Sequence, residues 1–89
     1  MQSEHSSNID QVLRAVLVET LGLPQARVAG FDAETGLFGA LPELDSMAVA
    51  EFLTEIEDRL GVVIEDDEVD GDMLASFGSL SAYLARKLG

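Results

Sequence analysis

Apolar residues recur at helical spacing near the start of the chain. They are Ile9, Val12, Leu13, Val16 and Leu21. Asn8 and Gln11 are spaced as a capping box before this stripe, and Gly22 follows it as a typical helix stop. The pattern predicts a first helix from about Asn8 to Leu21, preceded by a flexible tail over residues 1–7.

The segment between Gly22 and Asp45 shows neither helical periodicity nor strand alternation. Glycine and proline interrupt it at Pro24, Gly30, Gly36, Gly39 and Pro42. A structureless connection of this length is uncommon in a small domain unless it packs on the core or serves the function. We therefore expect a long loop that is anchored by apolar side chains. These are Val28, Phe31, Leu37, Phe38, Leu41 and Leu44.

A second and stronger apolar stripe follows Asp45. Its members are Val49, Phe52, Leu53, Ile56 and Leu60. The positions between them hold the acids Glu51, Glu55, Glu57 and Asp58. Since Gly61 ends the pattern, it predicts an amphipathic helix that turns its carboxylates toward water.

The last third of the chain predicts an extended linker, a short helix and a final long helix. Residues 62–64 have strand propensity, but no second strand candidate exists to pair with them, so we interpret them as a linker. A short third helix is expected either from Asp66 to Gly71 or from Asp70 to Leu74. Ser79 then caps a last helix, whose C-terminal turn carries two cations. The apolar residues of that helix are Leu80, Tyr83, Leu84 and Leu88.

Together these elements predict an all-α fold. It is a four-helix bundle of three long helices and one short one, with a long loop between the first two. At 89 residues the chain builds one small core and is too short for two independent domains. We expect a single domain over residues 8–89, acting as a monomer.

The net charge of −12 limits the classes of partner. Twelve of the 17 acids lie between Glu43 and Asp72, where Arg59 is the only base. Such a field repels nucleic acid and anionic membranes and attracts basic protein surfaces. No binding to nucleic acid and no insertion into a membrane is expected, and partners should carry Lys/Arg patches.

The chain contains no cysteine, so it has no thiol of its own and any thioester chemistry must borrow a sulfur atom. No apolar run is long enough to span a membrane, and the first residues lack the pattern of a secretory signal. We expect a cytoplasmic protein.

Ser46 stands in the first turn of the strongest predicted helix, directly after a good N-cap residue, Asp45. Free N–H groups and the helix dipole favour an anion at this end, so Ser46 is a suitable attachment point for a phosphate-linked group. Taken alone, however, an Asp-Ser dipeptide usually does no more than cap a helix.

The order of the elements decides between these interpretations. The chain begins with an amphipathic helix, which is followed by a loop with Leu37-Phe38. The segment Leu44-Asp45-Ser46-Met47 comes next, and an acidic turn follows after residue 64. In this order, from about Ile9 to Leu88, the chain resembles the acyl carrier protein family, whose attachment motif is Asp-Ser-Leu.

The resemblance implies that Ser46 receives 4'-phosphopantetheine from coenzyme A through a phosphopantetheinyl transferase. The arm's thiol then carries acyl groups as thioesters between acyl-loading, condensing or acyltransferase enzymes. The chain would be a carrier and a substrate of those enzymes, with no catalytic residue and no metal site of its own.

Two departures from the fatty-acid carriers concern the pathway. Met47 replaces the usual leucine, and residues 42–44 replace a glycine-containing segment before the motif. The segment from Leu41 to Met47 is similar to carriers found with exosortase and exopolysaccharide genes in Gram-negative bacteria. Fatty acid, lipid or exopolysaccharide-linked biosynthesis is expected, while an aminoacyl or polyketide cargo remains open.

The predicted second helix also suggests the surfaces for partners and cargo. Its outward face offers partner enzymes Asp45, Met47, Glu51, Glu55 and Asp58. The apolar residues that would receive an acyl chain are Val49, Phe52, Leu53, Ile56, Leu74, Phe77 and Leu80.

Three other interpretations are weaker. A calcium loop beginning at Asp66 fails at its twelfth position, where Phe77 stands instead of a bidentate glutamate. A serine hydrolase would need a base to activate Ser46, but the only histidine is His5 in the predicted tail. Tyr83 is better explained by packing in the core. The competitor from another class is an unmodified acidic interaction module.

Overall fold

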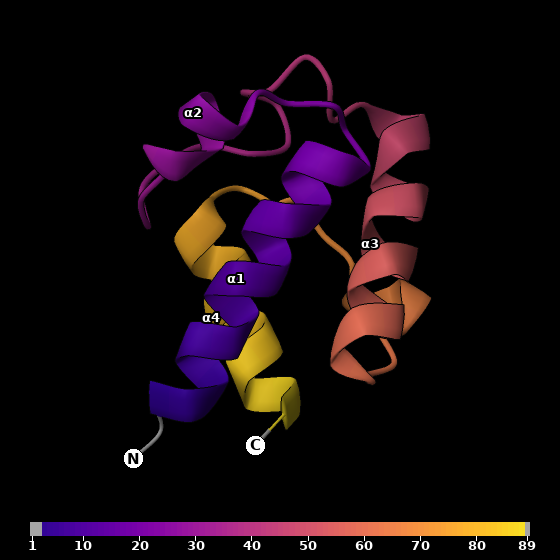
Figure 1. The fold of residues 1–89 in the computed structure, drawn as a ribbon. Coiled ribbons are helices and arrows are strands. Elements are labelled where there is room, and N and C mark those ends of the chain that lie inside the picture. The colour runs from indigo at the N-terminus through magenta and orange to yellow at the C-terminus, as the bar shows by residue number, and fades with distance from the viewer. Residues whose placement is uncertain (1–2, 89) are drawn as a thin grey trace.

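The computed structural model describes the backbone of residues 3–88 and the side chains of residues 8–88 (Figure 1). Its four α-helices are α1 (Ser3–Glu19), α2 (Gln25–Ala29), α3 (Ser46–Leu60) and α4 (Phe77–Leu88). A 3-10 helix, η1 (Asp66–Glu68), follows α3. Within these residues the chain forms no strand, only an isolated bridge between Gly36 and Ser76. The predicted all-α class is confirmed.

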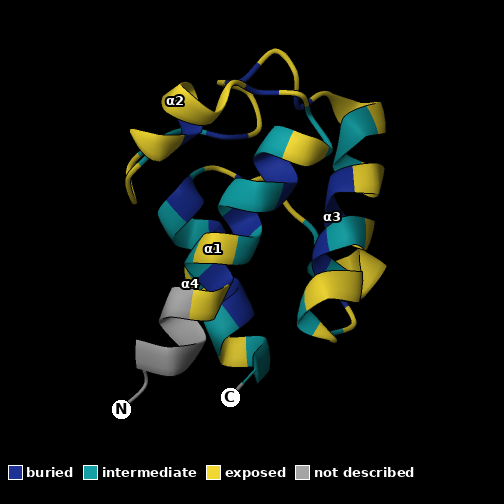
Figure 2. Ribbon diagram, viewed as in Figure 1, coloured by how far each residue is buried: buried dark blue, intermediate teal, exposed yellow. Residues whose placement is uncertain are grey.

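Helix α1 is the centre of the bundle, since α2, α3 and α4 all pack against it. In Figure 1, α3 stands to the right of α1 and α4 crosses behind α1, while α2 and the long loop cross one end of the bundle. The inward faces supply the core (Figure 2). Its largest fully buried side chains are Phe52, Ile9, Leu13, Leu17, Leu37, Leu44, Ile56, Leu80, Leu84, Val16 and Val28. Apart from Tyr83, no side chain with a polar or charged group is buried among the described residues.

The first helix begins earlier than its sequence pattern indicates. It starts at Ser3, so the expected boundary after residue 7 does not coincide with a helix end. The residues before Asn8 include no glycine or proline, and a helix extends readily from a formed turn where no breaker stops it. The side chain of His5 lies outside the described residues.

The short α-helix lies in the loop after α1, which corrects its predicted position. Helix α2 has only five residues and buries only Val28, too few for a periodic pattern. The Arg14 guanidinium stabilises it, donating 2.6 Å and 3.0 Å hydrogen bonds to the carbonyls of Val28 and Phe31. Arg14 also pairs with Asp10 and lies 4.9 Å from the centre of the Phe77 ring.

The second half of the loop is fixed to the segment that leads into α4. Four backbone hydrogen bonds of 2.8 to 3.0 Å join residues 33–38 to residues 74–78. Most of the predicted anchors are buried or partly buried, but Phe38 is 41% exposed and is not one of them. The loop therefore packs on the core as expected, and it holds one phenyl ring at the surface.

Helix α3 has the ends that the sequence predicts. Asp45 is its N-cap, and Gly61 ends it in the left-handed conformation with φ 69°. Phe52, Leu53 and Ile56 are buried, with the remaining stripe residues partly buried. The predicted linker over residues 62–64 is extended.

In place of the predicted short third helix, the acidic segment forms η1 and then turns. Its like charges oppose a longer helix, so that only three residues are helical. A capping box between Glu65 and Glu68 caps the N-terminus of η1. Tyr83 and Lys87 of α4 both reach Glu68 Oε1, at 2.6 Å and 2.8 Å. Tyr83 therefore packs in the core and also fastens η1 to α4.

These contacts shift two pKa values in opposite directions. The hydrogen bond from Lys87, followed by the one from Tyr83, lowers the pKa of Glu68 to about 2. Burial, together with the bond to Glu68, raises the pKa of Tyr83. Since the folded pKa of Glu68 is depressed, its contribution to stability is complete above the ordinary value of 4.5 and is lost as pH falls through about 2.

No helix in the described part of the chain is long and apolar enough to cross a membrane.

Candidate functional site

Ser46 is the first residue of α3, and its side chain is exposed. The preceding Asp45 has an extended backbone, with φ −93° and ψ −176°, which turns the chain into the helix. One carboxylate oxygen of Asp45 accepts hydrogen bonds from the N–H groups of Met47 at 3.1 Å and Ala48 at 2.9 Å. The serine is thus presented on a rigid, capped helix start.

The cap changes the electrostatic argument for an anion at this place. Two N–H groups at the start of α3 are already bonded to the Asp45 carboxylate, which also brings a negative charge. A phosphate here gains less from the helix end than the sequence pattern indicates.

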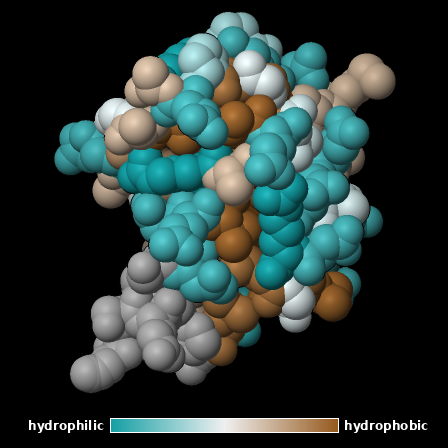
Figure 3. Space-filling view, in the orientation of Figure 1, coloured by the Kyte–Doolittle hydropathy of each residue, from teal (hydrophilic) through white to brown (hydrophobic). Residues whose placement is uncertain are grey.

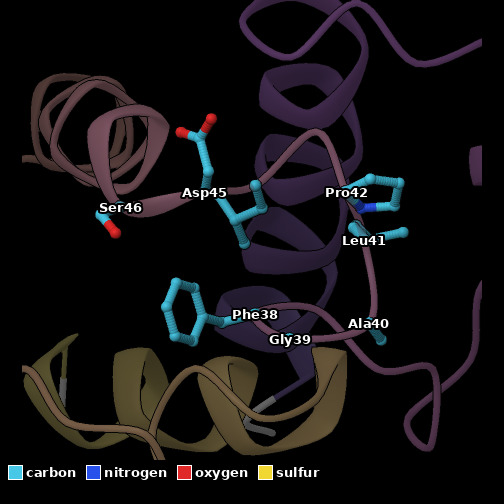
Figure 4. Close-up of a pocket in the computed structure, with 8 residues that line it drawn as sticks. Phe38, Gly39, Ala40, Leu41, Pro42, Asp45 and Ser46 are labelled. Atoms are coloured by element: carbon cyan, nitrogen blue, oxygen red, sulfur yellow. The ribbon is translucent and has the colours of Figure 1, made fainter.

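Ser46 opens onto two hollows in the surface. One, of about 520 Å³, lies along the loop before α3. Its lining residues are Phe38, Gly39, Ala40, Leu41, Pro42, Leu44, Asp45 and Ser46. In Figure 4 the Ser46 hydroxyl points to the side on which the Phe38 ring lies, while the Asp45 carboxylate points to the other side.

The second hollow lies between α3 and the segment that follows η1. It measures about 250 Å³. Its lining residues are Phe38, Ser46, Val49, Val69, Asp70, Gly71 and Leu74. A group attached to Ser46 can reach either space without unfolding any element.

The predicted cargo residues divide into two sets. Val49 and Leu74 line the hollow beside Ser46. The other five, Phe52, Leu53, Ile56, Phe77 and Leu80, lie in the closed core. Sequence reasoning did not assign Phe38, Val69, Asp70 or Gly71 to this hollow, because none of them belongs to a periodic stripe.

The predicted partner residues lie on the exposed side of α3 with one exception. Asp45, Met47, Glu51 and Asp58 are exposed, and Met47 is 85% exposed. Glu55 is only partly exposed and pairs with Arg59 at 3.3 Å. Arg59 also binds Glu19 of α1, and that hydrogen bond raises the pKa of the guanidinium. The charge of Glu55 is therefore partly compensated within the protein.

The acids after α3 do not assemble into a metal site. Among the described residues no group of three His, Cys, Asp or Glu side chains could hold a metal ion. Glu68 is engaged by Tyr83 and Lys87, and an Asp70 oxygen accepts the N–H of Met73 at 2.8 Å.

Figure 3 shows hydrophilic side chains over most of one face, with hydrophobic patches along its centre.

Comparison with known proteins agrees with this geometry. The sequence model of the family described as "Phosphopantetheine attachment site" matches residues 11–84. The solution NMR structure of a holo acyl carrier protein from Nitrosomonas europaea superposes with a TM-score of 0.81. It is 32% identical, and the alignment covers 91% of this chain and 95% of that one. No curated protein gave a significant match.

Proposed function

Because the chain belongs to the acyl carrier family, whose covalent cofactor is 4'-phosphopantetheine, we propose that Ser46 is the residue that carries this arm. One observation supports the assignment most. Among the serines whose side chains the structure describes, Ser46 is the exposed one, while Ser76, Ser79 and Ser81 are partly buried. Ser46 also lies inside the stretch that matches the family.

The surroundings of Ser46 supply a place for the arm but no catalyst for its attachment. The two hollows beside it are lined by apolar side chains, glycine, proline and aspartate, with no histidine or lysine. The Asp45 carboxylate caps α3 and points to the side away from the Ser46 hydroxyl (Figure 4), so we propose that the general base that takes the serine proton belongs to the transferase. This chain contributes an accessible hydroxyl at a fixed helix end.

The cargo of the arm is proposed to be an acyl chain bound as a thioester. The apolar hollow at Val49 and Leu74 suits a hydrocarbon chain better than a charged aminoacyl group. We propose fatty acid, lipid or exopolysaccharide-linked biosynthesis as the pathway, supported by the segment from Leu41 to Met47. We further propose that the protein acts as a cytoplasmic monomer whose single domain spans residues 8–89.

The carrier function is tested by loading the wild-type protein. After incubation with coenzyme A, Mg²⁺ and a broad transferase, the intact mass should rise by one phosphopantetheine. The new thiol should then accept an acyl group that neutral hydroxylamine removes, as a thioester requires. An unchanged mass would instead favour the unmodified interaction module.

Partner enzymes are proposed to bind the outward face of α3. Glu51 and Asp58 are exposed there and form no ion pair within the described residues, while Met47 offers a flexible apolar contact beside Ser46. Carboxylates placed in this way steer basic partners toward the serine.

Reversing these two charges, Glu51→Lys with Asp58→Lys, is expected to slow arm transfer about tenfold at low salt through a slower encounter. Stopped-flow or quenched transfer assays measure this rate. Added NaCl should reduce the difference in transfer rate between the wild type and the double variant. The matched control reverses Glu34 and Asp67, two exposed acids outside α3. Equal rates for both double variants would place recognition elsewhere.

A further inference from the structure

Met47 is the most exposed large apolar side chain of the described residues. It is 85% exposed, and of the three large apolar side chains at the surface it is the only one on α3. The other exposed residues of that helix are polar or charged, apart from one alanine. The apolar part of the proposed partner surface therefore depends on a single side chain, directly beside Ser46.

Met47 also brings an oxidisable sulfur atom to this surface. The chain has no cysteine, so before an arm is attached its only sulfur atoms are those of its three methionines. A peroxide converts a thioether to a sulfoxide. One oxygen atom passes to the sulfur as the O–O bond breaks, the sulfur loses two electrons, and the reduced peroxide leaves as water or an alcohol. The product is polar, and methionine sulfoxide reductases reverse the change.

The two methionines of the described part of the chain differ in what protects them. Met73 is 7% exposed and packs in the core, whereas Met47 is not part of the core cluster. A peroxide therefore reaches the sulfur of Met47 much more easily than that of Met73. The Asp45 cap is bonded to the backbone N–H of Met47, at 3.1 Å, and not to its side chain. Oxidation of Met47 should thus leave both the core and the start of α3 intact.

The sulfoxide opposes binding only when a partner covers it. In the free protein its oxygen lies in water. A partner that packs an apolar surface on Met47 must remove that water without replacing the hydrogen bonds, which weakens the complex. The charges of Glu51 and Asp58, which steer the encounter, do not change. Oxidation should therefore act on the docked complex and leave the approach of the partner as it was.

Resting on the proposal that partner enzymes bind this face to act on Ser46, we propose that Met47 is a reversible oxidation site that controls the loading of this carrier. The thioether form is competent to dock with the transferase. The sulfoxide form keeps the fold and the acceptor serine but docks poorly. Reduction of the sulfoxide restores loading without synthesis of new protein.

The test uses the full-length, unloaded protein as wild type and as Met47→Leu and Met73→Leu variants. Each is treated with hydrogen peroxide, catalase removes the excess, and peptide mass mapping records the oxygen added at each methionine. The transferase, coenzyme A and Mg²⁺ then load treated and untreated samples, and each treated protein is compared with its own untreated sample. Leucine keeps an apolar side chain of similar size at residue 47 but has no sulfur. Met1 is present in all three proteins, so its oxidation does not distinguish them.

Met47 should be oxidised before Met73 in the wild type. The kcat/KM of loading should then fall about tenfold in the wild type and in Met73→Leu, mainly through a higher KM for the carrier, at an unchanged melting temperature. Met47→Leu should keep its own untreated rate. Methionine sulfoxide reductases for both sulfoxide epimers should restore loading of the wild type.

An unchanged loading rate in a wild type whose Met47 is oxidised would overturn the proposal. An equal loss in Met47→Leu, or oxidation of Met73 before Met47, would overturn it as well. In each of these cases the untreated proteins still load, so Ser46 keeps its proposed role. Failure of the untreated wild type to load would overturn both proposals.

Discussion

Replacing Ser46 with alanine is expected to abolish the addition of phosphopantetheine completely while leaving the fold intact. The serine hydroxyl is the proposed acceptor, and alanine has no atom that can form the phosphodiester. Alanine is also a good helix former, so the start of α3 and the Asp45 cap should persist. Intact mass after incubation with coenzyme A, Mg²⁺ and the transferase measures the outcome.

The control for this experiment is Ser81→Ala. Ser81 lies in α4 and is partly buried, so its loss should leave the modification of the protein unchanged. A Ser46→Ala protein that still gained one phosphopantetheine would contradict the assignment. Circular dichroism of both variants checks that the comparison is made between folded proteins.

Replacing Gly78 with alanine is expected to destabilise the fold by about 2 kcal/mol, lowering the melting temperature by roughly 10 °C. A Cβ at this position would lie 2.7 Å from the carbonyl oxygen and 2.9 Å from the Cβ of Ala33. The same carbonyl accepts the Gly78 N–H at 2.8 Å. The loop must therefore move off α4, and the contacts that hold Phe38 in place should loosen with it.

The matched control is Gly71→Ala, where a new Cβ meets nothing within 4 Å. Its stability should stay within about 1 kcal/mol of the wild type, because alanine also restricts the unfolded chain. Urea denaturation of the three proteins gives the comparison. Since alanine is a better helix former than glycine, a loss of stability in Gly78→Ala is due to the clash with Ala33. Equal stability for the two variants would show that the loop is not fixed to α4.

The sequence predicted those parts of the fold that depend on local periodicity. The apolar stripe after Asp45, with a capping aspartate before it and Gly61 behind it, places α3 correctly. Helix α2 was not predicted, because it buries only Val28 and is stabilised by Arg14, which lies 14 residues earlier in the chain. Contacts between distant residues leave no periodic trace in the sequence.

The same limit applies to the site. The position of Ser46 at a helix start followed from the capping Asp45 and the apolar stripe after it, and the structure has it there. The two hollows beside Ser46 could not be predicted from the sequence, because they depend on the hydrogen bonds between residues 33–38 and residues 74–78. Phe38 looked like another core anchor in the sequence, and only its mounting on this pairing shows that the ring faces the space beside Ser46.

The central claim, that this carrier bears its arm on Ser46, is tested most directly by fragmenting the modified wild-type protein in a mass spectrometer. Fragment ions that end before Ser46 should keep their unmodified mass, and those that include it should carry one phosphopantetheine. An arm on any other serine, or a fully treated protein whose fragments all keep their unmodified mass, would contradict the claim.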